Sequence, residues 1–136
     1  MKNTLSLKEP KLFQKTINKG VWYGGNLIST YILSNTGIDT EVNFIGLAVG
    51  KKAGKATKRN RVKRIIRAAY LSLESEINAT GKIFLFVWRA KAHFEDVTYD
   101  GIRKDIERAF KKAGLLKWRE FWFFWLKFIK IRYLHY

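Results

Sequence analysis

Apolar residues recur at helical spacing in three segments of the chain. In the first, residues 10–19, a proline stands in the opening turn and Gly20 can end the helix. In the last, residues 98–114, Thr98 can cap the N-terminus and Gly114 can end the helix. The residues that share one side are Leu12, Phe13, Thr16 and Ile17 in the first segment and Ile102, Ile106, Ala109, Phe110 and Ala113 in the last. Each helix can therefore pack one side against a core.

The middle helix is predicted to start near Thr57 and to run to residue 77. On a helical wheel one side carries Val62, Ile65, Ile66, Ala69, Leu73 and Ile77. The other side carries Asn60, Arg61, Lys63, Arg64 and Arg67, which we call the basic face. Arg59 falls nearer the apolar side and should reach out from the first turn. One side of this helix is thus expected to cover a core, and the other to meet a charged partner.

Three further segments predict β-strands. Residues 21–34 mix aromatic and β-branched side chains and predict one strand, bent at Gly24 and Gly25. Residues 42–50 predict a second strand after a turn at 34–40. Residues 82–88 are almost continuously apolar and predict a third strand that is buried on both faces. The pattern as a whole predicts a compact α+β domain.

Composition and charge narrow the range of possible functions. The chain has 136 residues, no cysteine, 47% hydrophobic residues and a formal net charge of +16. A folded domain with so large a positive charge is expected to bind a polyanion, either a nucleic acid or an anionic membrane surface. The absence of cysteine excludes disulfides and thiolate chemistry. The N-terminal residues lack an apolar run of signal-peptide length, so we expect a cytoplasmic protein.

The positive charge is concentrated in one place. No Asp or Glu stands between Glu41 and Glu74, whereas residues 51–67 hold nine Lys or Arg. Cations in the first turns of a helix oppose its macrodipole, so this arrangement favours a function over local stability. A glycine-containing loop at 50–54 precedes the helix, whose free N–H groups would add to an anion site. The segment predicts a phosphate-binding surface, but not a nucleotide P-loop, because the Gly-Lys-Ser/Thr ending is absent.

The order of residues in 46–70, GLAVGKKAGKATKRNRVKRIIRAAY, closely resembles the signature of the bacterial ribonuclease P protein component. The family pattern joins a Gly-Leu-x-Val strand end, a Lys-Lys-x-Gly loop and Arg-Asn-x-x-Lys-Arg-x-x-Arg on a helix. All three parts are present at the family's spacing. The order of elements is also similar from about residue 3 to residue 114.

This resemblance implies a fold and a function. The fold is a two-layer αβββαβα-like domain of the ribosomal protein S5 domain 2-like type, with a left-handed crossover through the basic helix. It would occupy residues 1–114 and leave 115–136 as a C-terminal extension. The implied function is that of the protein subunit of ribonuclease P, which assists Mg²⁺-dependent removal of the 5′ leader from precursor tRNA. The catalytic RNA and the substrate would hold most of the Mg²⁺, and no organic cofactor is expected.

The resemblance also assigns residues to two RNA partners. Those expected to bind the catalytic RNA are Lys51, Lys52, Lys55, Lys58, Arg59, Asn60, Arg61, Lys63, Arg64 and Arg67. Those expected to line a groove for the precursor's leader, between the sheet and the first helix, are Phe13, Ile17, Tyr31 and Arg89. Ile17 stands where the family commonly has a second aromatic residue. Aromatic faces beside basic side chains hold single-stranded RNA with little sequence preference, as variable leaders require.

Other functions compete with this one. His93, Glu95, Asp96 and Asp100 could suggest a Mg²⁺-dependent protein nuclease, but acids at the start of a helix are favourable in any case. They also do not converge from several elements, as a hard cation requires. We therefore predict no catalytic residue and no metal site on this chain. A structural RNA-binding protein of ribosomal type and a membrane-peripheral protein remain as alternative functions.

The extension at 115–136 is rich in aromatic residues, with nine between Trp118 and Tyr136. Charged residues interrupt it, so it does not predict a membrane span. Arg119, Glu120, Lys127 and Lys130 share roughly one third of a helical wheel, which predicts an amphipathic helix on an anionic membrane or a protein partner. A helix folded back on the domain's own core is the equal alternative.

Deletion of residues 117–136 separates these alternatives. If the extension contacts lipid, the truncated protein should stay soluble and bind RNA but lose binding to anionic liposomes, measured by cosedimentation. If the extension belongs to the core, the truncated protein should instead unfold, as circular dichroism would report.

Overall fold

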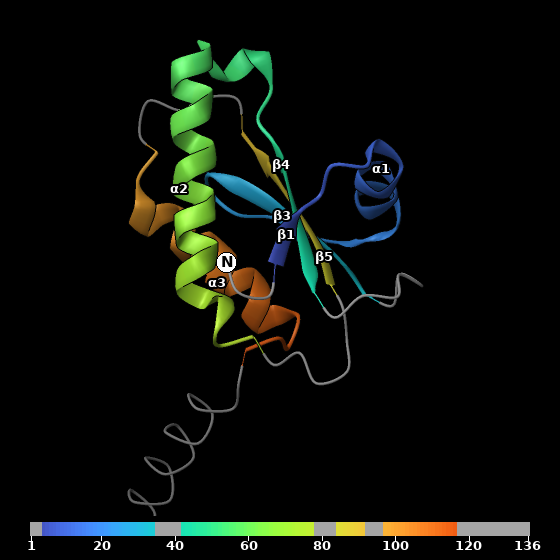
Figure 1. The fold of residues 1–136 in the computed structure, drawn as a ribbon. Coiled ribbons are helices and arrows are strands. Elements are labelled where there is room, and N and C mark those ends of the chain that lie inside the picture. Colours follow the sequence, from blue (N-terminus) through green and yellow to red (C-terminus); the bar gives the residue numbers. More distant parts are fainter. Residues whose placement is uncertain (1–3, 35–41, 78–83, 92–96, 117–136) are drawn as a thin grey trace, which may run out of the picture.

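The computed structural model describes residues 4–34, 42–77, 84–91 and 97–116, which form a five-stranded sheet with helices on both sides (Figure 1). The strands are β1 (Thr4–Ser6), β2 (Val21–Tyr23), β3 (Ile28–Ser34), β4 (Asn43–Ala48) and β5 (Phe84–Ala90). The helices are α1 (Pro10–Lys19), the 3₁₀ turn η1 (Lys51–Ala53), α2 (Ala56–Glu74) and α3 (Tyr99–Lys112). This mixed architecture confirms the predicted α+β class.

The sheet has the order β1-β4-β5-β3-β2, with β5 at its centre. The β1–β4 and β4–β5 pairs are parallel, and the β5–β3 and β3–β2 pairs are antiparallel. Helix α2 makes the connection between the parallel neighbours β4 and β5. The parallel pairing agrees with the crossover that the resemblance implies, and the left hand of that crossover stays a prediction.

The two faces of the sheet are covered differently. Figure 1 shows α2 and α3 on one side and α1 on the other. The main core lies under α2 and α3, where the rings of Tyr70, Phe86, Trp88 and Phe110 pack within 5.0–6.4 Å of one another between centroids. Burial raises the pKa of Tyr70 to about 12, and its hydroxyl is 2.6 Å from the hydroxyl of Thr4 in β1. This hydrogen bond ties the first strand to α2.

The helices follow the predicted pattern closely. Helix α1 begins at Pro10 and ends before Gly20, as expected. Helix α2 buries Val62, Ile66, Ala69 and Leu73, as the wheel predicts. It ends at Glu74 rather than at the predicted residue 77, and the chain beyond it buries Ile77. In α3 the hydroxyl of Thr98 accepts a hydrogen bond from the N–H of Gly101 at 3.1 Å, which confirms the predicted cap. None of the described helices combines the length and the apolar content that a bilayer crossing requires.

The prediction of a single bent strand over 21–34 was wrong, because the segment forms the antiparallel hairpin of β2 and β3. The buried carboxylate of Asp105 in α3 holds the turn by accepting hydrogen bonds from the N–H groups of Asn26, Leu27 and Ile28 at 2.8–3.1 Å. A Cβ atom on Gly25 would lie 2.6 Å from the Asp105 carboxyl carbon. The reversal thus depends on a residue about 80 positions away, which local propensity does not reveal.

Strand β1 was not predicted either. It has only three residues and pairs with β4 along the edge of the sheet. So short a segment shows no alternation that sequence reasoning can use. The predicted turn at 34–40 lies, after Ser34, outside the described residues.

Replacing Asp105 with Ala should destabilise the domain by about 3 kcal/mol or more, because three turn amides lose a charged acceptor. Asp100→Ala is the control, since this exposed carboxylate only complements the first turn of α3 and should cost less than about 1 kcal/mol. Urea unfolding followed by circular dichroism gives both values. Equal losses in the two variants would contradict the anchoring role of Asp105.

Candidate nucleic-acid interface

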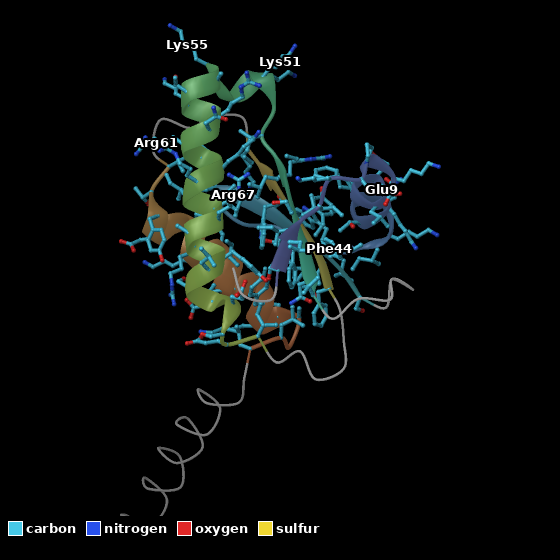
Figure 2. The ribbon with its side chains drawn as sticks, viewed as in Figure 1. Glu9, Phe44, Lys51, Lys55, Arg61 and Arg67 are labelled. Carbon is cyan, nitrogen blue, oxygen red and sulfur yellow. The ribbon has the colours of Figure 1, made fainter. Side chains whose placement is uncertain are left out.

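The basic face lies along the outer side of α2. Asn60, Arg61, Arg64 and Arg67 are exposed, and Lys63 is half-buried. Figure 2 shows Arg61 and Arg67 on this helix, with Lys51 and Lys55 near its N-terminal end. The apolar side of the same helix fixes these positions, because burial of Val62 and Ile66 leaves the helix one orientation on the sheet. The sequence-predicted cations are thus held on one rigid element.

These cations have no carboxylate partners within the part of the chain that the structure describes. The ion pairs there join Arg103 and Lys111 to Glu107, and Arg108 to Asp105, all within α3. Like charges one turn apart on a helix repel one another, so the basic face costs stability in the free protein. Binding a polyanion would relieve that repulsion.

The N-terminal end of α2 is also arranged for anions. The 3₁₀ turn η1 places Lys51 and Lys52 just before the helix, and Gly54 makes the bend with a φ of 118°, which favours glycine. The N-cap Lys55 makes no capping hydrogen bond with its side chain, and the first turn has no acidic residue. The first N–H groups therefore lack a side-chain acceptor and add to the positive potential.

The remaining predicted cations of this end differ in exposure. Lys51, Lys52, Lys55 and Lys58 are exposed. Arg59 is half-buried, and its Nε atom is buried without a hydrogen-bond partner among the described residues. The prediction that Arg59 leans toward the apolar side agrees with this position.

The sheet face opposite α2 and α3 is turned toward α1, and we call it the α1 face. It carries Trp22, Ser29, Tyr31, Leu33, Phe44, Gly46, Ala48, Leu85, Val87 and Arg89, the positions that alternate with the strand residues of the main core. The guanidinium carbon of Arg89 lies 5.6 Å from the centre of the Tyr31 ring, a cation–π contact. Two of the predicted leader residues thus touch each other.

Phe13 reaches the same face from α1. A Cβ atom on Gly46 would lie 2.8 Å from two carbons of the Phe13 ring, so the ring rests directly on the glycine backbone. Ile17 is half-buried one turn further along α1. Of the four predicted leader residues, Phe13 and Ile17 therefore lie on the helix that covers this face, and Tyr31 and Arg89 lie on the sheet itself.

A small hollow joins the two surfaces at the edge of the sheet, where β1 ends. Its volume is about 160 Å³, which is below the range of drug-sized ligand pockets but enough for a phosphate group or part of a base. Phe13 lines it from α1, and Lys63 and Arg67 line it from α2. The rest of its wall is Ser6, Leu7, Ile45, Gly46 and Leu47. The Phe13 ring, which rests on the α1 face, and two cations of the basic face therefore border one cavity.

Sequence reasoning missed several residues of the α1 face. Trp22 and Phe44 place two more aromatic rings there, and Gly46 forms the platform for Phe13. Trp22 was missed because the hairpin was not predicted. Its pairing with Tyr31 can be recognised only when β2 and β3 are known to be separate strands. The acids of the cluster at 93–96 lie outside the described residues.

Comparison with known proteins gives the same assignment. The family model for ribonuclease P matches residues 1–114. The chain belongs to the ribonuclease P protein family. A ribonuclease P protein component from Bacillus cereus is 34% identical over 116 residues, covering 85% of this chain and 96% of that protein. Members of this family are protein components of a ribonucleoprotein endoribonuclease, so the chain takes part in tRNA 5′ processing, with an RNA partner and a precursor tRNA substrate.

Solved structures of ribonuclease P proteins share the fold. The Staphylococcus aureus RNase P protein superposes with a TM-score of 0.63 at 29% identity, covering 82% of this chain and 97% of that one. The RNase P protein from Thermotoga maritima gives a TM-score of 0.64 at 24% identity, over 79% and 96% of the two chains. The α+β architecture is therefore that of ribonuclease P proteins.

Replacing Arg64 and Arg67 with Ala should weaken binding of the ribonuclease P RNA and flatten its salt dependence. The log–log slope should fall by about 0.7–0.9 for each phosphate that the variant no longer neutralises. The matched control is Lys104→Ala with Lys112→Ala, which removes the same charge from exposed positions of α3. Filter binding across a salt series measures both. An unchanged affinity and slope in the folded Arg64/Arg67 variant would contradict the role of the basic face.

Proposed function

We propose that this chain is the protein subunit that positions precursor tRNA on the catalytic RNA of ribonuclease P. In this proposal the basic face and the lysines at 51–58 bind the catalytic RNA, and the α1 face binds the 5′ leader. The observation that carries it is the hollow at the sheet edge, which Phe13 lines together with Lys63 and Arg67. The two RNA partners could therefore meet at this hollow.

The leader would be held by stacking and charge. Tyr31 offers an aromatic face beside the Arg89 guanidinium, and Phe13 offers another about two strands away. Unpaired bases stack on such rings whatever their identity, and nearby cations neutralise the phosphates. With Ile17 in place of an aromatic residue, α1 supplies one stacking surface and one aliphatic contact. This mode would let one protein accept leaders of different sequence.

Bond cleavage would belong to the catalytic RNA. Within the described residues no group of three or more His, Asp or Glu gathers as a metal site would require, and Asp105 is already occupied by the turn at 26–28. The Mg²⁺ ions that activate water for phosphodiester hydrolysis would be held by the RNA and by substrate phosphates. The protein's part is to bind both polyanions and to reduce their repulsion.

Two further expectations accompany the proposal. A cytoplasmic location fits a subunit that works on precursor tRNA. The contact of residues 115–136 with a membrane or a protein stays a prediction, because residues 117–136 lie outside the described part of the chain.

Purified protein with Mg²⁺ should leave precursor tRNA intact, and addition of the cognate RNA should give 5′ leader removal. The RNA alone should need more Mg²⁺, because the protein's cations otherwise share the screening of two polyanions. Gel analysis of end-labelled precursor over a Mg²⁺ series measures this. Leader cleavage by nuclease-treated, RNA-free protein that is lost on substituting Glu95, Asp96 or Asp100 would overturn the assignment of catalysis to RNA.

A further inference from the structure

Trp22 is a large aromatic residue left in solvent on the edge strand β2. Its exposed fraction is 59%, which is high for a tryptophan in a folded domain. The side chain is nevertheless placed by its surroundings. A Cβ atom on Gly24 would lie 2.8 Å from the indole ring, so the ring rests on the backbone of that glycine. The indole therefore presents a supported surface to solvent.

Trp22 stands in one row with the residues that the leader is proposed to contact. The pairing of the strands places Trp22 beside Tyr31, Tyr31 beside Val87, and Val87 beside Gly46. Phe13 covers the Gly46 end of this row. Both end rings are thus supported by a glycine, and the row crosses four strands of the α1 face.

The charge around this row favours an anionic occupant. Residues 10–34, which form α1, β2 and β3, contain no Asp or Glu and include Lys11, Lys15 and Lys19. Arg89 lies over the ring next to Trp22 in the row. An aromatic surface among cations is the arrangement that holds single-stranded nucleic acid. A second copy of this basic chain would gain less from it, since like charges would meet.

We propose that Trp22 extends the leader-binding surface to the outer edge of the sheet and stacks on a leader nucleotide beyond those that contact Phe13 and Tyr31. This inference rests on the proposed function, because it adds a contact to the same face. The hollow with Lys63 and Arg67 lies where β1 ends beside β4, and β2 is the opposite edge of the sheet. Three strand spacings, about 14 Å, separate the two ends of the row. A leader that enters beside the basic face reaches Trp22 only if it is long enough.

The test is the affinity of the holoenzyme, full-length chain with its cognate RNA, for precursors whose leaders grow one nucleotide at a time. Trp22→Ala should bind mature tRNA and short-leader precursors like the original protein. Beyond a threshold length it should lose about fivefold or more in affinity, as expected for one stacked base. Trp22→Phe should recover part of this loss. A 2-aminopurine placed at the threshold position should be quenched by the original protein and less by Trp22→Ala.

Val21→Ala is the matched control, because Val21 is equally exposed on β2 but points to the other face of the sheet. Phe13→Ala tests the proposed function separately, since it should weaken binding at every leader length. If Phe13→Ala loses affinity and Trp22→Ala matches the original protein at all lengths, the Trp22 proposal is overturned alone. If neither variant changes affinity, the leader-binding role of the whole face fails. A change of sedimentation with Trp22→Ala and no leader effect would assign the residue to self-association and also overturn the proposal.

Discussion

The position of β5 at the centre of the sheet is the constraint on which both the basic face and the α1 face depend. Its residues Phe84 to Trp88 are all buried, and they point alternately to the two faces. Phe86 and Trp88 hold α2 and α3 in place through the aromatic core, while Val87 lies in the row under α1. One strand therefore sets the distance between the basic face and the α1 face. The strand is continuously hydrophobic because its side chains are buried on both faces of the sheet.

Helices α2 and α3 show how differently charge can be used in one domain. In α3 a threonine caps the N-terminus, an acid stands in the first turn, two lysines stand in the last, and ion pairs link successive turns. In α2 the first turn has no acid, the last turn has no base, and the N-cap side chain makes no hydrogen bond. Burial of its apolar side has to stabilise α2 instead. The contrast fits a structural role for α3 and, in the proposed function, an RNA-binding role for α2.

Much of this organisation could be predicted from the sequence. Helical spacing located α1, α2 and α3, although α2 ends at Glu74 rather than at residue 77, and the wheel of α2 separated its buried and basic sides. The resemblance, rather than the pattern, supplied the two RNA partners. The predictions that failed involve long-range pairing: β1 depends on β4, and the hairpin turn depends on Asp105. The aromatic ring of Trp22 was missed for the same reason, because its place on the α1 face is defined only by its partner strand.

The packing of Phe13 on Gly46 has a consequence for how such proteins can diverge. The ring occupies the space that any side chain at position 46 would need, so the sizes of the side chains at positions 13 and 46 constrain each other. A methyl group at 46 would lift α1 from the sheet, and a smaller residue at 13 would leave a gap over the β4 strand. Changes at these positions should therefore be inherited together. In relatives that lack the aromatic ring on the first helix, the position of Gly46 should therefore accept a larger residue.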